Sequence, residues 1–172
     1  MKRLAKLFSI TGAMILVVSG AGVAFSSTAQ AAAESICAAP GNSYCWSQPD
    51  TGNAIVLTDT TNIASFTPES CNANGCQLVA VDGACARAQY SGGPVLLYGC
   101  GGTTELSEYW IRVIGCGGYY YWQNVGYSDY SGQEVVAEAE TLSQGADIYG
   151  GNADLGCGFG TSGEVVNQWI WG

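Results

Sequence analysis

Residues 85–100 read CARAQYSGGPVLLYGC, a short run led by Cys85 and an apolar run that ends at Tyr98, separated by a Ser-Gly-Gly-Pro turn and enclosed by cysteines. Glycine and proline between two apolar runs are typical of a hairpin of two strands. Beyond residue 36, hardly any segment has the apolar period of a helix, whereas short apolar runs and glycines recur. The sequence therefore predicts an all-β domain, a sandwich or a barrel.

The pattern of this hairpin recurs on both sides of it. Each unit has a strand, a turn, a second strand, a short loop and a last strand that ends in an aromatic residue. Residues 85–100 align without a gap with residues 136–151, and an earlier copy begins at Cys45. We therefore expect one domain over residues 32–172, built of three units at about 37–80, 81–123 and 124–172.

A second register places Gly52, Gly92 and Gly132 at equal intervals of forty residues. It aligns the first two units equally well, but it leaves the aromatic strand of the third unit without a counterpart. We prefer the first register for that reason.

The first 31 residues have the order of a secretory signal peptide. A basic start is followed by an almost wholly apolar or small run over residues 7–25 and by small residues over 29–33. Serine, threonine and glycine interrupt the run and no basic cluster follows it, which favours a cleaved signal over a membrane anchor. We expect cleavage after Ala31 or Ala33 and an extracellular protein.

Cleavage makes the domain strongly acidic. It leaves Arg87 and Arg112 against fourteen acidic residues, a net charge of −12. Such a field repels phosphate backbones and anionic lipid, so we expect neither nucleic acid nor a membrane as a partner. Neutral and cationic ligands remain.

The cysteines predict disulfides. An even number in an exported chain is typical of disulfide bonds, so we expect four bridges. The chain has no histidine and no paired C-x-x-C motif, so we expect neither a metal site nor another cofactor. The eight cysteines are Cys37, Cys45, Cys71, Cys76, Cys85, Cys100, Cys116 and Cys157.

The repeated unit resembles the ricin-type β-trefoil family, over nearly all of residues 37–172. The shared features are a cysteine-led strand, a glycine turn, an apolar strand that ends in an aromatic residue and a cysteine, and an Asn-Gln-aromatic strand. The family's usual Gln-x-Trp signature is not intact, because the last strands read QWIW over 168–171 and EYW over 108–110. The resemblance implies a β-trefoil of three units, and in this register we expect Cys85 to bridge Cys100.

The resemblance also implies a sugar site in each competent unit, made of an acid, an amide, an aromatic platform and an Asn-Gln pair. Carboxylate and amide groups can bond sugar hydroxyls while an aromatic face covers the apolar side of the ring. The third unit matches this set best, so we expect a secreted carbohydrate-binding module with one main site. Its residues are Glu138 as the acid, Asp147 in place of the amide, Tyr149 as the platform, and Asn167 and Gln168 as the pair.

The other units match less well. The second has Arg87 and Leu96 in place of the acid and the amide and keeps Tyr98, and the first has Ser47 and Val56 and no platform.

Some of these positions also suit purely structural roles. Trp110 and Trp169 are expected to fill the core, and Tyr149 fits either a platform or a core position. Glu138 and Asp147 alternate with apolar neighbours, as residues on a solvated strand face do.

Two other classes of function are weighed against sugar binding. The absence of histidine removes the usual base of nucleophilic triads, and acid pairs such as Glu138 with Glu140 or Glu105 with Glu108 have no spacing that distinguishes a glycosidase, so we expect no enzyme. Residues 68–76, PESCNANGC, could form a disulfide-tied loop that a secreted protease would meet. The alternative is therefore a protease inhibitor or an interaction protein of the same fold.

Overall fold

A computed structural model describes residues 32–41, 43–59, 62–102, 104–132, 134–152, 157–160 and 165–172. The expected signal peptide, residues 1–31, lies outside the described residues. Within those ranges, no helix is long and apolar enough to cross a membrane.

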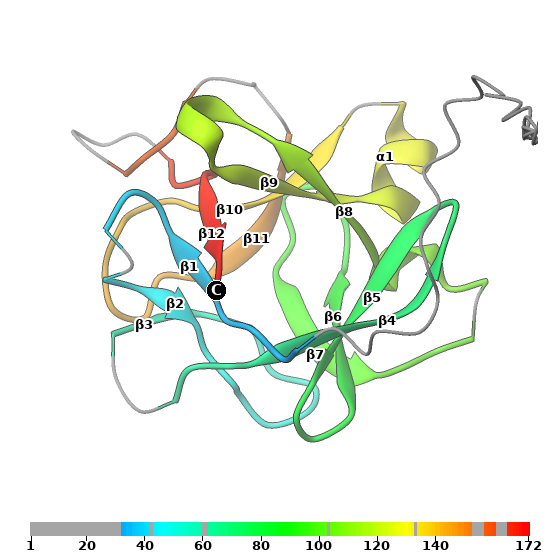
Figure 1. Cartoon of the computed structure of the whole chain (residues 1–172). Helices are drawn as coiled ribbons and strands as arrows, with labels where there is room; N and C mark the ends of the chain where they lie inside the picture. Colours follow the sequence, from blue (N-terminus) through cyan, green and yellow to red (C-terminus); the bar gives the residue numbers. More distant parts are fainter. Residues whose placement is uncertain are drawn as a thin grey trace, which may run out of the picture.

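The described residues form a chain of short strands with few helical turns (Figure 1). The strands are β1 (Ile36–Ala38), β2 (Cys45–Trp46), β3 (Leu57–Thr58), β4 (Phe66–Asn72), β5 (Gly75–Ala80), β6 (Ala84–Ala88), β7 (Val95–Gly99), β8 (Tyr109–Ile114), β9 (Tyr120–Asn124), β10 (Val135–Ala139), β11 (Ile148–Asn152) and β12 (Trp169–Trp171). The helical segments are α1 (Val125–Ser131) and the 3-10 turns η1 (Leu106–Glu108) and η2 (Cys116–Gly118).

Six strands close into a barrel. The antiparallel pairs β1–β12, β12–β9, β9–β8, β8–β5 and β5–β4 form a continuous series. Two backbone hydrogen bonds between Glu34 and Phe66, of 3.0 and 2.8 Å, join the ends of that series. The barrel therefore has no free edge among these strands, which removes the unpaired edge that an open sheet would present.

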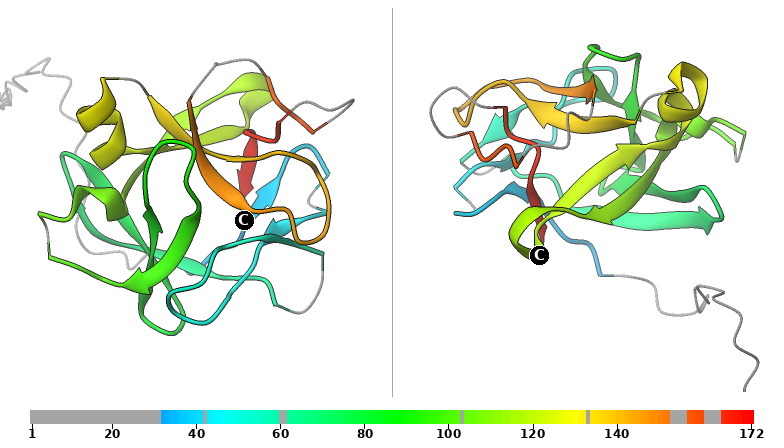
Figure 2. Two further views of the ribbon diagram at one scale, coloured as in Figure 1. Left: turned by 180° about the vertical axis from the view of Figure 1, so that it is seen from behind. Right: turned by 90° about the horizontal axis from the view of Figure 1, so that it is seen from above.

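The remaining strands form three hairpins, β2–β3, β6–β7 and β10–β11. They contact one another in a cycle through the bridges Ala54–Leu96, Pro94–Tyr149 and Asp147–Val56. Figure 2 shows the β10–β11 hairpin and the C-terminus at opposite ends of the molecule. A barrel closed at one end by three cyclically paired hairpins is a β-trefoil, so the predicted all-β, three-unit fold is confirmed.

The strand pairing tests the repeat register directly. Each unit's first hairpin strand pairs with the barrel through an equivalent residue, namely Cys45, Cys85 or Val136, as predicted. The second hairpin strands are offset: Cys85 faces Tyr98, but Val136 faces Gly151. The third hairpin is therefore two residues longer, and the predicted gap-free match of residues 85–100 to 136–151 is wrong beyond the turn. Tyr149 corresponds to Leu96 and not to Tyr98.

The short helix α1 has no counterpart in the predicted pattern. Asn124 caps its start by accepting a hydrogen bond from the Tyr127 amide at 3.2 Å. It ends at Gly132, whose φ of 68° suits the left-handed conformation of a helix end. Gly132 is thus a helix cap and not a hairpin turn, which disfavours the register of forty-residue intervals.

Aromatic residues fill the core. Trp110 and Trp169 are 1 % and 0 % exposed, as predicted, and their rings lie 6.3 and 5.6 Å from that of Trp46. Their indole N–H groups donate to the carbonyls of Ala86 (2.8 Å) and Ala137 (2.9 Å). In the first unit Trp46 occupies the position equivalent to these alanines, so one unit contributes a large side chain where the other two contribute small ones.

Four disulfides connect all eight cysteines, as predicted. The expected Cys85–Cys100 bridge is present, with a Cα–Cα distance of 5.0 Å. The other three are Cys37–Cys45, Cys71–Cys76 and Cys116–Cys157.

Candidate functional site

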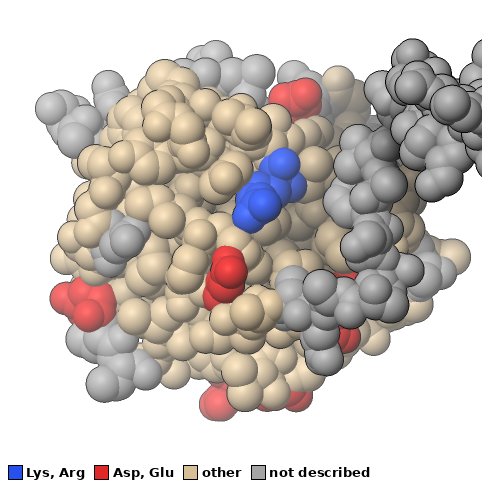
Figure 3. Space-filling view, in the orientation of Figure 1, with Lys and Arg blue, Asp and Glu red and all other residues tan. Residues whose placement is uncertain are grey.

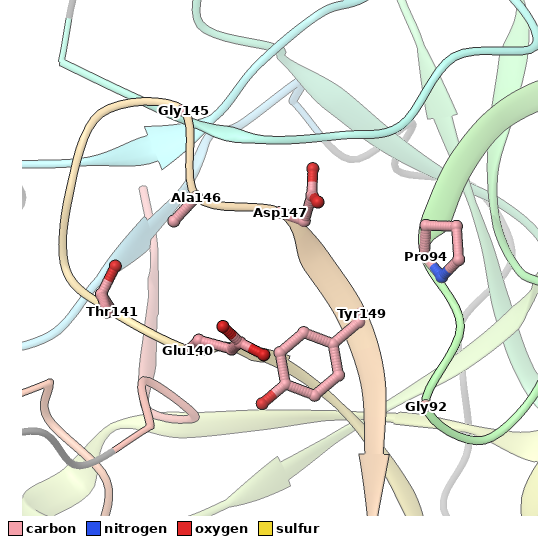
Figure 4. A pocket seen from close by; sticks show the side chains of 8 residues that line it. All are labelled: Gly92, Pro94, Glu140, Thr141, Gly145, Ala146, Asp147 and Tyr149. Atoms are coloured by element: carbon pink, nitrogen blue, oxygen red, sulfur yellow. The ribbon is translucent and has the colours of Figure 1, made fainter.

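A cavity of about 640 Å³ lies between the third hairpin and the turn of the second (Figure 4). Its volume falls within the range of small-molecule sites, roughly 300–1,000 Å³. The third unit supplies most of the wall, and the second unit supplies the opposite side. The lining residues are Gly92, Pro94, Glu140, Thr141, Gly145, Ala146, Asp147 and Tyr149.

Two predicted site residues, Asp147 and Tyr149, line this cavity together. Asp147 directly precedes β11 and Tyr149 is its second residue, so the two side chains leave the extended backbone on the same face. Asp147 is exposed and Tyr149 is half-buried. Figure 4 shows the Glu140 carboxylate close to the Tyr149 ring and Pro94 across the cavity. The result is an aromatic face flanked by two carboxylates.

Glu138 lies behind this wall and not in it. It faces Tyr149 across the β10–β11 pair, is only 5 % exposed, and is hydrogen-bonded to the Tyr149 side chain. Burial, together with the negative charges of Glu138 and Glu140 and that hydrogen bond, raises the pKa of Tyr149 to about 12. The phenol, protonated at neutral pH, donates to Glu138, and this contact holds the ring in place.

Asn167 and Gln168 are buried, 1 % and 0 % exposed, and bind other parts of the protein. The Asn167 side-chain oxygen accepts from the Gly158 amide and from the Gln168 side chain, both at 3.0 Å. The Gln168 side-chain oxygen accepts from the Cys116 amide at 2.9 Å. Neither residue lines the cavity, so the structure brings together Glu138, Asp147 and Tyr149 and places the Asn-Gln pair elsewhere.

The sequence-based site omitted Glu140 and Thr141 and the second unit's Gly92 and Pro94. Glu140 and Thr141 belong to the longer loop of the third hairpin, which the gap-free alignment concealed. Gly92 and Pro94 come from the neighbouring unit, and a unit-by-unit search does not look there. The Pro94–Tyr149 bridge is the contact that joins the two sides.

In the second unit, an ion pair occupies the place of the sugar-binding acid. Arg87 corresponds to Glu138, and its guanidinium lies 3.2 Å from the Glu105 carboxylate and 4.0 Å from Glu108. Glu108 is fully buried and accepts hydrogen bonds from the Gln77 side chain (2.9 Å) and the Gly101 amide (2.8 Å). These polar groups bind one another, so the second unit does not present them to a sugar as the third unit's residues are presented.

In the first unit the equivalent residue is Ser47, which is 3 % exposed. Its hydroxyl accepts a hydrogen bond from the Val56 amide at 3.0 Å and so serves the hairpin itself. Over the described ranges, moreover, no three His, Cys, Asp or Glu side chains are grouped so as to hold a metal ion.

The predicted protease-facing segment, residues 68–76, is part of a paired hairpin. Pro68 and Glu69 pair with Leu78 and Gln77, and the Cys71–Cys76 bridge closes the tip.

The chain is similar to a known protein in its backbone fold. No family model matches the chain, and no curated protein matches it. Among solved structures, the designed threefold-symmetric protein ThreeFoil superimposes with a TM-score of 0.61 at 17 % sequence identity, over 80 % of this chain and 96 % of that one. The chain is a β-trefoil. At this level of identity, the trefoil's likeness to ThreeFoil concerns backbone architecture alone.

Proposed function

We propose that this β-trefoil is a secreted carbohydrate-binding module with one main site, the cavity between its second and third units. The observation that carries the proposal is the grouping of Tyr149, Asp147 and Glu140 around that cavity. An aromatic ring covers the apolar face of a sugar, and carboxylates accept hydrogen bonds from neighbouring hydroxyls.

The site differs from the one expected from sequence. Asp147 and Glu140 supply the acceptors, Thr141 a hydroxyl, and Tyr149 the platform. Glu138 acts through Tyr149, because it is buried and bonded to the phenol. Asn167 and Gln168 support the surrounding backbone.

The acidic wall also bears on which saccharides fit. The cavity lining includes two carboxylates and no basic side chain. Carboxylated sugars would be repelled, whereas neutral and amino sugars would not. We therefore propose neutral or cationic saccharides as the ligand class.

Binding is proposed in preference to catalysis. A glycosidase presents two carboxylates to one glycosidic bond. The acid pair weighed from the sequence, Glu138 with Glu140, does not meet in the cavity, since Glu138 is buried behind Tyr149. Glu140 and Asp147 do both line it, and we propose them as hydrogen-bond acceptors for sugar hydroxyls.

Secretion belongs to the same proposal. Several disulfides are typical of extracellular proteins, and this chain has four. The inhibitor alternative receives less support, because β4 is paired with β5 from Phe66 to Glu69 and again at Asn72, with an irregularity in between. A protease cleft would have to accept a tight hairpin there in place of an extended loop.

The test is a glycan array of neutral, amino and carboxylated saccharides, followed by calorimetry on the oxidised protein. We expect Tyr149→Ala and Asp147→Asn each to weaken binding about tenfold, the effect of losing a stacking face or a charged acceptor. Tyr98→Ala and Asp50→Asn are the matched controls, because both residues are exposed and lie outside the cavity.

Binding that survives both cavity variants would move the site elsewhere in the molecule. Failure to bind any saccharide, with inhibition in a protease panel on the same sample, would replace the proposal by the inhibitor alternative.

A further inference from the structure

A second cavity, of about 310 Å³, lies among the barrel strands at the end that carries the C-terminus. It is separate from the proposed sugar site, because the two share no lining residue. Strands β4, β5, β8, β9 and β12 form its wall. The lining residues are Pro68, Gly75, Cys76, Leu78, Trp110, Ile111, Arg112, Trp122 and Trp171.

The rim of this barrel cavity follows the threefold pattern of the fold. Three rim residues, one from each unit, occupy equivalent positions: Pro68, Arg112 and Trp171. Each lies directly opposite a buried residue of a neighbouring strand, and these partners are Leu78, Trp122 and Ile36. Directly opposite residues project from the same face of a sheet. The three rim residues therefore stand on the inner face of the barrel, and one of them is an arginine.

The body of the cavity is aromatic and apolar. Trp122 and Trp171 form a tilted pair with ring centroids 5.0 Å apart and planes at 53°. Trp122 is 4 % exposed, and Leu78 and Trp110 are buried still more completely. Such walls offer a large apolar contact area to a ring or a short hydrocarbon chain.

Arg112 brings a positive charge to this apolar mouth. Its guanidinium lies over the Tyr120 ring, 4.6 Å from the centroid. Among the described residues, Arg87 makes both of the ion pairs within 4.0 Å. No described carboxylate lies within that distance of the Arg112 guanidinium. Glu34, which occupies the rim position equivalent to Tyr120, is not within that distance.

Arg112 is the arginine of the described residues that is available to an anionic ligand. Figure 3 shows basic atoms near the centre of a largely uncharged face, with acidic groups below them and around the edge. Arg87 is the other arginine of the described residues, and it is paired with Glu105.

We propose that the barrel cavity binds a small amphipathic carboxylate, with its apolar body packed against the paired rings of Trp122 and Trp171 and its carboxylate on Arg112. The volume, at the lower end of roughly 300–1,000 Å³, fits a single aromatic ring or a short acyl chain. Arginine suits the carboxylate because its planar donors match the two oxygens. The amphipathic class follows from pairing an apolar wall with a cation that no carboxylate of the described residues pairs with. This attraction is local to Arg112, whereas the repulsion from the domain's net charge of −12 acts at longer range and is screened by salt.

The experiment titrates the oxidised protein with 3-phenylpropionate and with its neutral amide, which has the same apolar body. Calorimetry gives the two affinities, and the indole N–H resonances of Trp122 and Trp171 locate the binding. We expect the carboxylate to bind about tenfold more tightly than the amide, and both ligands to shift these two indole resonances more than that of Trp46.

Arg112→Gln should reduce carboxylate affinity to that of the amide and leave amide affinity unchanged. Arg112→Lys should retain part of the preference, because it keeps the charge but loses the planar fork. Val113→Gln is the matched control, since it introduces the same side chain at the next position of β8, on the opposite face. Unchanged thermal unfolding midpoints verify that the variants remain folded.

Equal affinity of the native protein for acid and amide would overturn the proposal. So would unaltered carboxylate binding by Arg112→Gln, or the absence of any indole shift at millimolar ligand.

Discussion

Tyr149 connects the wall of the candidate site to the buried Glu138 behind it. Its ring forms part of the cavity wall, while its hydroxyl is bonded to a glutamate that is almost inaccessible to solvent. An acidic residue behind an aromatic platform can therefore affect ligand binding without touching the ligand. Glu138 is best described as a positioning residue.

Alkaline pH should expose this coupling. The pKa of Tyr149 is raised from 10.0 to about 12 in the folded protein, so the neutral phenol is favoured there. In the unfolded chain the phenol ionises near 10, and unfolding therefore releases a proton between pH 10 and pH 12. The stability that Tyr149 contributes is complete below pH 10 and is lost as the pH rises through this window.

The measurement compares urea unfolding of the native protein with that of Tyr149→Phe, a variant without this titration. We expect the advantage of the native protein to shrink steadily from pH 10 to pH 12. A difference that stays constant over that range would show that Tyr149 titrates alike in the folded and unfolded states.

At the scale of single elements, the β4–β5 hairpin shows how closely two strands approach a third. Gly75 has a φ of 102°, and a Cβ atom added there would overlap the carbonyl of Trp110 on β8. Glycine is thus required twice, for its backbone conformation and for the room it leaves. The same carbonyl belongs to a residue that lines the barrel cavity.

Gly75→Ala should consequently destabilise the protein by about 1–3 kcal/mol more than Gly52→Ala, the usual cost of overpacking. Gly52 is a matched reference because its φ is 94° and nothing lies within 4 Å of the added atom. Chemical unfolding of the two variants gives the comparison. Equal losses would mean that β8 moves away without cost.

For the molecule as a whole, the units share a backbone plan and differ in chemistry. The position that holds Glu138 in the third unit holds Arg87 in the second and Ser47 in the first, and each has different partners. At this position the second unit forms an ion pair, the first unit forms a hydrogen bond to the backbone, and the third unit has an acid beneath an aromatic ring. Threefold geometry therefore does not imply three sites.

The Cys116–Cys157 bridge acts at this largest scale, because it joins the turn between β8 and β9 to the segment before β12. Its cysteines are 41 residues apart, whereas Cys71 and Cys76 are 5 apart. Loop-closure entropy predicts a loss of about 4 kcal/mol on removing the former and about 2 kcal/mol on removing the latter. Thermal and urea unfolding of the paired alanine variants measure the two losses, and a larger loss from the short bridge would contradict this ranking.

Much of the architecture could be predicted because it is local. Cys45 and Cys85 mark the first strand of the first two hairpins. Phe66, Trp110 and Trp169 mark the last strand of each unit, although β4 and β8 begin at or beside these residues and do not end there as predicted. The two extra residues of the third hairpin could not be recognised, since Tyr98 and Tyr149 align without them although they differ in position. Nor could the burial of Asn167 and Gln168, which depends on distant contacts with Gly158 and Cys116.

The pairing of β1 with β12 also has a consequence in time. Cys37 faces Ile170, so β1 cannot complete its pairing in the barrel until β12 is present. Such a ring cannot close until β12 has been made, and contacts this distant in sequence form slowly. During synthesis, the hairpins can form early because their strands are close in sequence. The barrel forms later, because its strands are distant in sequence. Closure of the barrel therefore depends on residues 169–171, more than 130 positions after β1, the strand with which they pair.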